Sequence, residues 1–415
     1  MTPRRWLTLA SAGLLAGCAA ASAPSTPSAS PNPPRALAET EKALVQSSND
    51  FGIRLFREAS RRAGSSDVSL SPLSVSLALG MAYNGSAGET QSEMARVLGL
   101  TALTTEQANQ SSRDLVALLV SMDGDISLDI ANSIWYRNGL PLLPSFLEAN
   151  RVYFDARVAG LDFASPAATD SINAWVREKT HDRIQGILDR PISPSEVILL
   201  LNAVYFKGDW AQPFDPSTTG DAVFHAPDGD RPVKLMERAF AKLSYLETED
   251  FQAVDLPYGR GHFRMAVFLP KQGRQVDDWV ARLDGPSWSG WMRSFADREV
   301  RLSLPRFSVE YDTSLVDVLE SLGIARAFDE RLADFSRMSS GSGIYLTEVR
   351  HKTYVRVDEK GSEAAAVTGI TGSITSAPAD GPVVMRVDRP FVFVIHDRHS
   401  EAMLFSGTVA RPLSR

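Results

Sequence analysis

Apolar residues recur at helical spacing in the first third of the chain. In residues 49–63, for example, Phe51, Leu55 and Phe56 fall on one face of a helix, because residues three or four apart lie on the same side. The pair Ser71-Pro72 is a start signal for a second helix. The pattern predicts helices at 49–63, 73–83, 90–98 and 106–122.

Later segments consist of short apolar runs that are typical of strands. Several are apolar almost throughout, as in strands that are buried on both faces of a large covered sheet. The predicted strands are 126–136, 197–206, 254–257, 264–270, 299–304, 353–358 and 391–396. No internal repeat with a period of about twenty to fifty residues divides the chain. We therefore predict one compact α+β domain, residues 39–415.

The first 17 residues, 1–17, are typical of an export signal. Arg4 and Arg5 precede an apolar run, residues 6–16, that is too short to span a bilayer. The run ends in Leu-Ala-Gly-Cys at residues 15–18, which resembles the lipobox of bacterial lipoproteins, where the cysteine becomes the acylated first residue. We predict lipidation of Cys18 and membrane attachment through it. The alternative is an ordinary signal peptide with a chance cysteine.

Residues 18–38 are predicted to be the lipidated cysteine and a tether. From residue 19 to about residue 34 they are almost wholly Ala, Ser, Pro and Thr, a composition that buries too little apolar surface to fold. Ala19 directly after Cys18 is compatible, by the same resemblance, with sorting to the outer membrane. We predict an exported lipoprotein of the cell envelope, in the outer membrane or at the cell surface. Because Cys18 is the only cysteine, the fold depends on packing rather than on disulfides.

The charge balance argues against a nucleic-acid partner. The chain has 43 basic and 50 acidic residues and a net charge of −7. Removing the signal leaves 41 basic against 50 acidic residues, and an acidic protein repels the phosphate backbone. The cluster Arg57, Arg61 and Arg62 lies at helical spacing and can bind a polyanion, but a solvated helix face is the favoured interpretation.

The histidines show no pattern typical of an enzyme. They are His181, His225, His262, His351, His396 and His399. None lies in a recognisable nucleophile elbow or metal-ligand motif, and the last two fall at a predicted strand end and turn. Surface histidines are the favoured interpretation, so a Ser/His/Asp hydrolase, the rival class, is disfavoured. We predict no enzyme activity, no metal and no cofactor.

Ten short motifs follow one another along the chain. They occupy residues 71–74, 173–176, 202–210, 256–258, 269–270, 304–307, 333–336, 349–352, 389–393 and 404–407. In this order the sequence resembles the serpin family of serine protease inhibitors, in a bacterial lipoprotein form, from about residue 49 to residue 412. One motif alone is unspecific, but ten in the family's order make coincidence negligible.

The resemblance implies a fold and a mechanism. The serpin fold has three β-sheets, about nine helices and an exposed reactive-centre loop that acts as bait. An inhibitory serpin is cut in this loop by a serine-type or cysteine-type endopeptidase and traps it as a covalent acyl-enzyme. The cut loop then inserts into the main sheet, sheet A, as strain in the native form is released. The implied protein is a monomeric suicide substrate whose partner is a target protease.

The bait segment can also be recognised from its residue types. Its hinge residues are Glu359, Gly361, Ser362, Glu363, Ala364, Ala365 and Ala366. Because alternate residues of a strand face opposite sides, Ser362, Ala364 and Ala366 share one uncharged face and Glu363 lies on the other. Small, uncharged side chains suit a segment that leaves water and enters a sheet. This favours an inhibitor; the alternative is a non-inhibitory serpin that acts as a binding or structural protein.

Spacing places the reactive bond. Seventeen residues counted from Glu359, as the resemblance implies, end at Thr375, so the predicted cut is Thr375-Ser376; Ser373, Ile374 or Ser376 remain as other bait residues. We expect the segment 359–375 to lie outside the sheet before the cut. A small uncharged bait residue suits a shallow, uncharged specificity pocket, which predicts an elastase-like or subtilisin-like target rather than a trypsin-like one.

The resemblance implies two supporting sites near the opening of the sheet. The first, the shutter, is a hydrogen-bonded cluster of Ser71, Ser74, Asn202 and His351. A neutral histidine both donates and accepts, so it can bridge a hydroxyl and an amide across strands that must separate. The second, the breach, groups Glu359 with Arg306 and Trp210. A pair between carboxylate and guanidinium there would restrain premature opening.

Overall fold

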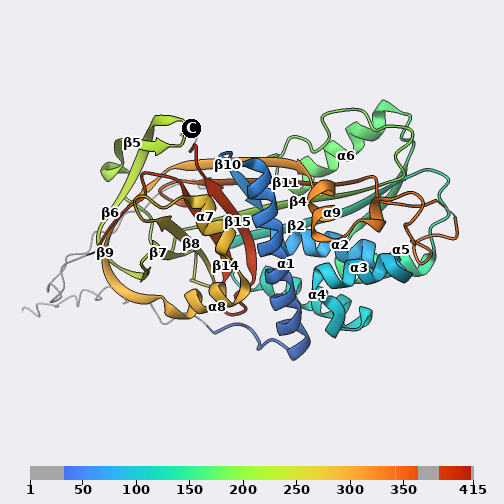
Figure 1. The fold of residues 1–415 in the computed structure, drawn as a ribbon, viewed down its shortest axis with the longest axis horizontal. Coiled ribbons are helices and arrows are strands. Elements are labelled where there is room, and N and C mark those ends of the chain that lie inside the picture. Colours follow the sequence, from blue (N-terminus) through green and yellow to red (C-terminus); the bar gives the residue numbers. More distant parts are fainter. Residues whose placement is uncertain (1–31, 342, 363–382, 413–415) are drawn as a thin grey trace, which may run out of the picture.

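The computed structural model describes residues 32–341, 343–362 and 383–412, which form an α+β fold (Figure 1). Within these residues there are nine α-helices, in agreement with the number that the resemblance implies. They are α1 (Glu39–Ala63), α2 (Pro72–Gly85), α3 (Gly88–Leu98), α4 (Thr105–Ser121), α5 (Pro144–Phe154), α6 (Pro166–Lys179), α7 (Val276–Arg282), α8 (Gly285–Ser294) and α9 (Val316–Leu322). None of the helices in this part of the chain is long and apolar enough to cross a membrane.

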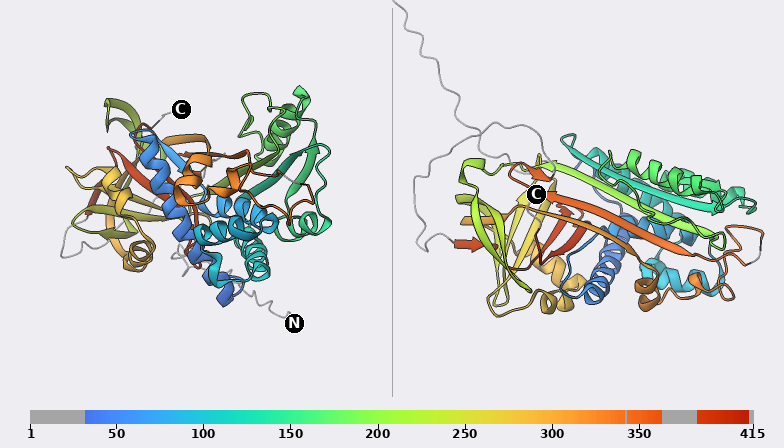
Figure 2. Two further views of the ribbon diagram at one scale, coloured as in Figure 1. Left: turned by 45° about the vertical axis from the view of Figure 1, so that its right-hand side comes forward. Right: turned by 90° about the horizontal axis from the view of Figure 1, so that it is seen from above.

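A six-stranded sheet is built around one central strand, β4 (Ile198–Asp209). Its other strands are β2 (Ile126–Arg137), β3 (Arg157–Leu161), β10 (Phe307–Ser314), β11 (Glu348–Val357) and the two-residue β12 (Gly361–Ser362). The order is β10, β11, β4, β2, β3, with β12 also paired to β4. β11 runs parallel to β4, whereas β2 and β12 run antiparallel to it. The long orange, green and cyan strands of this sheet lie side by side in the right-hand view of Figure 2.

The remaining strands of the described residues form a nine-stranded network. They are β1 (Val68–Leu70), β5 (Gly220–Ala226), β6 (Gly229–Glu247), β7 (Phe251–Pro257), β8 (Phe263–Pro270), β9 (Ala296–Pro305), β13 (Val383–Arg386), β14 (Phe391–Asp397) and β15 (Met403–Val409). The network has two parts, β5, β6, β9, β13 and β7, β8, β14, β15, β1, because the 19-residue β6 pairs with strands of both. With the six-stranded sheet, these two parts account for the three expected sheets.

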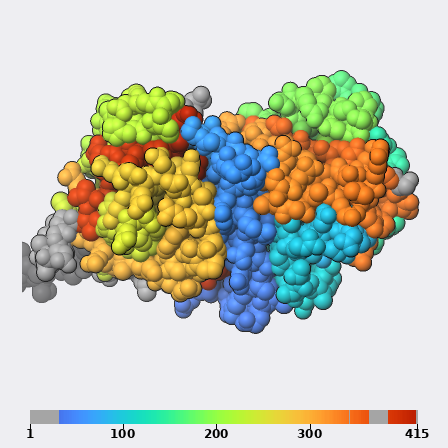
Figure 3. Space-filling view, viewed as in Figure 1, coloured from blue at the N-terminus to red at the C-terminus, as the bar shows by residue number. Residues whose placement is uncertain are grey.

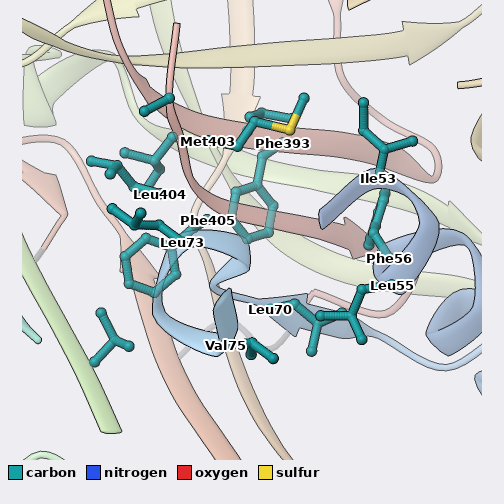
Figure 4. Packing of buried hydrophobic residues seen from close by; sticks show 14 of the residues in the cluster. Ile53, Leu55, Phe56, Leu70, Leu73, Val75, Phe393, Met403, Leu404 and Phe405 are labelled. Atoms are coloured by element: carbon teal, nitrogen blue, oxygen red, sulfur yellow. The ribbon is translucent and has the colours of Figure 1, made fainter. Parts of the chain in front are cut away.

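The main core lies between the nine-stranded network and the helices α1 and α2. α1, in blue, crosses the middle of the face shown in Figure 3, with the gold residues of α7 and α8 on one side and the cyan α3 and α4 on the other. Phe56 of α1, Leu73 of α2 and Phe393 and Phe405 of β14 and β15 are buried together (Figure 4). Such apolar burial is the main favourable term in folding, so packing stabilises this fold.

Several elements differ from the prediction for identifiable reasons. α1 begins at Glu39, ten residues before the predicted start. The carboxylate of Glu41 accepts a hydrogen bond from the main-chain N–H of Ala38 and forms an ion pair with Arg35. This capping interaction satisfies free amides at the helix start, although few apolar residues mark the first turns. β11 begins at Glu348 rather than at residue 353, since its residues alternate between buried and partly exposed positions and lack a continuous apolar run. The helices α5 to α9 and the strands β1, β3, β5, β6, β10, β13 and β15 were not predicted.

Candidate functional site

The six-stranded sheet is open at one end between its two parallel central strands. The pairing of β11 with β4 ends where Thr353 lies opposite Val204. Both strands continue beyond this point, β11 to Val357 and β4 to Asp209. Among the described residues, the last part of β11 keeps its pairing with β10 but is not paired with β4. A strand can therefore enter the sheet at this end, where backbone groups of β4 and β11 face each other without a ladder.

The first hinge residues already occupy this opening. Gly361 lies opposite Asp209 and Ser362 opposite Gly208 in an antiparallel pairing. A Cβ atom on Gly361 would come within 2.1 Å of the carbonyl oxygen of Gly208, so only glycine allows this approach. Ser362 is buried, and its hydroxyl is 2.8 Å from that of Tyr258. The expectation that segment 359–375 lies wholly outside the sheet is therefore wrong for its first residues.

The breach residues meet beside this opening. The Arg306 guanidinium donates to both carboxylate oxygens of Glu359, with Nε–Oε1 at 2.8 Å, Nε–Oε2 at 2.9 Å and Nη2–Oε1 at 2.6 Å. The hydroxyl of Thr219 also donates to Oε1, at 2.6 Å. Burial alone would raise the pKa of Glu359, but the hydrogen bonds from Arg306 and Thr219 outweigh it and hold this pKa below its usual range. The hinge carboxylate is thus charged and fully engaged.

Trp210 holds the turn that leads into the hinge. Its indole N–H donates to the carbonyl of Asp358 at 3.0 Å, and its main-chain N–H donates to Lys360. The indole is buried and stacks on the ring of Tyr258, with 4.3 Å between the ring centroids. Tyr258 therefore joins the breach to the hinge, since it contacts Trp210 with its ring and Ser362 with its hydroxyl. The sequence contained no signal for this role of Tyr258 beyond its place in a motif.

The four predicted shutter residues also lie together. His351 of β11 is fully buried and its Nδ1 is 2.8 Å from Oδ1 of Asn202, on the neighbouring β4. Its Nε2 accepts the main-chain N–H of Ser71 at 3.0 Å. The amide nitrogen of Asn202 donates to the hydroxyl of Ser74 and, at 2.8 Å, to Oδ1 of Asn132. Ser71 thus contributes its backbone rather than its hydroxyl, and Asn132 of β2 is a member that sequence reasoning missed.

This bonding pattern requires a neutral His351. Nε2 accepts a hydrogen bond, so the single ring proton lies on Nδ1 and is donated to Asn202. Burial lowers the pKa of His351 to about 3, because a charged imidazolium would lose its hydration there. The ring consequently bridges β11, β4 and the start of α2 without carrying charge.

The remaining predicted site residues lie outside the described residues. They are the hinge residues Glu363, Ala364, Ala365 and Ala366, the reactive bond Thr375-Ser376 and the lipidated Cys18. The described part of the hinge ends at Ser362, and the chain is described again from Val383, the first residue of β13.

The expectation of surface histidines is wrong for His262 and His396, which are buried. His351, which the resemblance places in the shutter, is buried as well. His396 Nε2 is 3.0 Å from Oδ1 of Asp255, whose other oxygen accepts from Arg264. Burial would raise the pKa of Asp255, but these two partners lower it to about 2. The described residues contain no group of three or more potential ligands that could hold a metal.

The arginine cluster on α1 is largely paired. Arg61 and Arg62 both bond the carboxylate of Glu58, at 2.7 Å. Arg62 also donates to the hydroxyl of Ser321 at 2.7 Å. The hydrogen bonds from Arg61 and Arg62 lower the pKa of Glu58 to about 2. Glu58 offsets part of the charge of these two arginines, which favours the solvated helix face over a polyanion site.

Comparisons with known proteins agree with this geometry. The family described as Serpin (serine protease inhibitor) matches residues 46–412. An uncharacterised serpin-like protein of Thermococcus kodakarensis is 34% identical over 377 residues, which cover 90% of this chain and 86% of that protein. Among solved structures, the native thermophilic serpin tengpin has a TM-score of 0.83 at 30% identity, covering 91% of this chain and 95% of its own.

Human thyroxine-binding globulin, solved as a complex with thyroxine, has the same TM-score of 0.83 at 27% identity, with 90% of this chain and all of its own covered. The fold, the open sheet end and these matches together establish the class: the chain belongs to the serpin family. Members of this family are generally protease inhibitors rather than enzymes.

Proposed function

We propose that this serpin inhibits a serine-type endopeptidase, or a cysteine-type one, by insertion of its cut bait segment between β11 and β4. The observation that carries the proposal is the open end of the six-stranded sheet, into which Gly361 and Ser362 already fit. An entering strand would pair with β4 on one side and β11 on the other and so gain backbone hydrogen bonds along both. The small, uncharged inward residues that follow in the sequence support the same role.

The proposed reaction begins as ordinary proteolysis. The catalytic serine of the protease attacks the carbonyl carbon of Thr375, the peptide bond to Ser376 breaks, and the new amine takes up the proton lost by the serine. The product is an ester between the protease and Thr375. Insertion of the freed segment then carries this ester away from the end of the sheet, so the protease is displaced before water can hydrolyse the ester.

Insertion has to separate β11 from β4, and the contacts that oppose it are specific. The hydrogen bond between His351 and Asn202 joins the two strands and must break. The pair between Arg306 and Glu359 fixes the turn before the hinge. These contacts keep the uncut chain in the form without insertion, and the new backbone hydrogen bonds outweigh them once the segment has a free end.

The target and the location follow from sequence alone and form part of the proposal. A small uncharged bait residue at position 375 suits an elastase-like or subtilisin-like protease. The lipid anchor at Cys18 would hold a monomeric inhibitor at the cell envelope, in the outer membrane or at the cell surface. The alternative is a non-inhibitory serpin, and the likeness to thyroxine-binding globulin shows that this fold also occurs in a protein solved with a small ligand.

The test is to mix residues 32–415 with elastase, subtilisin and trypsin. We expect a covalent complex with the first two that survives denaturing electrophoresis, and a rise in the melting temperature of the cut protein. Mass spectrometry of the released C-terminal peptide identifies the cut. Simple cleavage by every protease, with no rise in melting temperature, would support the non-inhibitory alternative.

Two matched substitutions separate insertion from cleavage. Ala366→Arg places a charge on the face of the hinge that enters the sheet core, whereas Ala365→Arg places it on the opposite face. We expect Ala366→Arg to be cut without forming the complex, because a buried unpaired charge opposes insertion. Ala365→Arg should still form it. Equal complex formation by both variants would contradict insertion as the trapping step.

A further inference from the structure

A cleft of about 610 Å³ lies between α1, α7 and the end of α9. Both α7 and α9 pack against α1, and Figure 3 shows α1, in blue, between the gold residues of α7 and α8 and the orange residues of α9. Val280, Ala281 and Leu322 give the cleft an apolar wall. Its size suits a ligand larger than a single amino acid, because ligand sites usually measure about 300–1,000 Å³. No residue of the hinge, the shutter or the breach lines it.

The charged side chains that line this cleft balance one another in number. They are the basic Arg54, Arg57 and Arg61 and the acidic Glu58, Asp277 and Asp278. Because the three positive and three negative charges cancel, the cleft as a whole attracts neither a polyanion nor a polycation. A ligand that carries both signs of charge is the better match.

Two of the three arginines already have partners. Arg61 bonds the carboxylate of Glu58 at 2.7 Å, and Arg54 donates to two main-chain carbonyls. Arg57 differs, because in the described part of the chain its exposed guanidinium forms no hydrogen bond or ion pair. It attracts Asp284 only at longer range, without contact. One cationic group is therefore left on the α1 side of the cleft.

The two aspartates on the α7 side also have no counter-charge in contact. Within the described residues, neither Asp277 nor Asp278 forms a side-chain hydrogen bond or ion pair. Burial, and then the charge of Asp278, raise the pKa of Asp277. No nitrogen of Arg57 lies within 4.0 Å of either carboxylate. The two sides of the cleft thus present opposite charges that a ligand can bridge.

A buried hydroxyl in the same cleft has no partner. Ser60 lines the cleft and is only 6% exposed, and its Oγ has no hydrogen-bond partner among the described residues. Buried hydroxyls are nearly always bonded, since an unpaired one destabilises a fold. An amide N–H or C=O of a bound ligand can supply the partner. This observation is independent of the charges and also indicates a polar ligand.

We propose that this cleft binds a short peptide with free termini. The carboxylate of the peptide pairs with Arg57, and its N-terminal ammonium group pairs with Asp277 and Asp278. An arginine matches a carboxylate with two parallel hydrogen bonds. Each extended residue spans about 3.3–3.6 Å, so the ends of a tripeptide can bridge opposite charges that are not in contact, whereas the charges of a free amino acid lie side by side. The site does not depend on protease inhibition.

The test is isothermal titration of the full-length chain with the tripeptide Ala-Leu-Ala in three forms: free, acetylated at its N-terminus, and amidated at its C-terminus. We expect the free form to bind about tenfold more tightly than either blocked form, since each blocked form loses one charge-assisted pair. Arg57→Gln should weaken the free form about tenfold but leave the amidated form unchanged, because the group that Arg57 binds is already absent. Asp277→Asn combined with Asp278→Asn should do the same for the free and acetylated forms.

Two exposed residues outside the cleft provide matched controls. Arg331→Gln and Asp170→Asn remove the same kinds of charge elsewhere, and both should leave all three affinities unchanged. The blocked peptides test the site on the unsubstituted chain, so the test does not depend on any variant folding. No binding of the free tripeptide at millimolar concentration would overturn the site. So would equal affinity for the free and blocked forms, an equal loss in the controls, or tighter binding of free lysine or spermidine than of the tripeptide.

Discussion

The neutral His351 of the shutter predicts a loss of stability in mild acid. In the unfolded chain a histidine has a pKa of about 6.5, while burial lowers the pKa of His351 to about 3 in the fold. Since the folded pKa is the lower one, the unfolded state binds the proton first as the pH falls. The stability that depends on neutral His351 is therefore complete above about pH 6.5 and is lost progressively between there and about pH 3.

The size of the effect follows from the two pKa values. Between pH 7 and pH 5 this one residue should lower the free energy of unfolding by about 2 kcal/mol, because each pKa unit is worth about 1.4 kcal/mol and the unfolded state is almost fully protonated at pH 5. Protonation also removes the acceptor for the Ser71 N–H. We expect the β11 and β4 strands to separate more easily in acid, with faster polymer formation.

The assay is denaturant unfolding at pH 7 and pH 5, with size-exclusion chromatography after incubation. His351→Gln keeps a donor and an acceptor but does not titrate, so its pH dependence should be smaller by about 2 kcal/mol. His225→Gln is the matched control, since the side chain of His225 is exposed and its ring bonds Asp230 at the surface. If His351→Gln and the unsubstituted chain lose the same stability between the two pH values, the reasoning is refuted.

Three further substitutions test the breach and the hinge. Glu359→Lys leaves the Arg306 guanidinium beside a second cation, at a cost of about 3 kcal/mol, so chromatography should show a latent or polymeric protein; a monomeric, fully inhibitory variant would contradict this. Gly361→Val forces a side chain against β4, and we expect about 1–3 kcal/mol lower stability in denaturant unfolding, whereas an unchanged midpoint would exclude the close approach. Tyr258→Phe leaves the buried hydroxyl of Ser362 without this partner, which should lower stability by about 1 kcal/mol; no change on melting would show that the bond is dispensable.

The central strand and the site motifs could be predicted because their signals are local. The apolar run of β4, interrupted only by Asn202, reflects burial on both faces from Ile198 to Phe206. Glycine at position 361 and the small residues after it are likewise visible in the sequence. The grouping of the shutter and breach residues came from the resemblance in motif order. The hydrophobic pattern of the sequence gives no information about it.

Contacts between distant residues could not be predicted in the same way. Asn132 reaches the shutter only because β2 pairs with β4 in a register that places it opposite Asn202. Tyr258 and Ser362 are 104 positions apart and meet through the fold of two strand networks. His396 was expected at the surface because nothing near it in sequence shows that Asp255, 141 positions away, lies 3.0 Å from its Nε2 in the fold.

The pairing of Gly361 with Asp209 fixes the register in which the residues after Gly361 would pair with β4. If the antiparallel pairing continues without a slip, each later residue moves one place back along β4, so Glu363 would meet Lys207 and Thr368 would meet Asn202. The charged outward residue of the hinge would thus find a cation across the ladder. In this register residue 372 would pair with Ile198, the first residue of β4. Thr375 lies three residues further on, so a protease attached to it would lie just beyond the opposite end of the sheet.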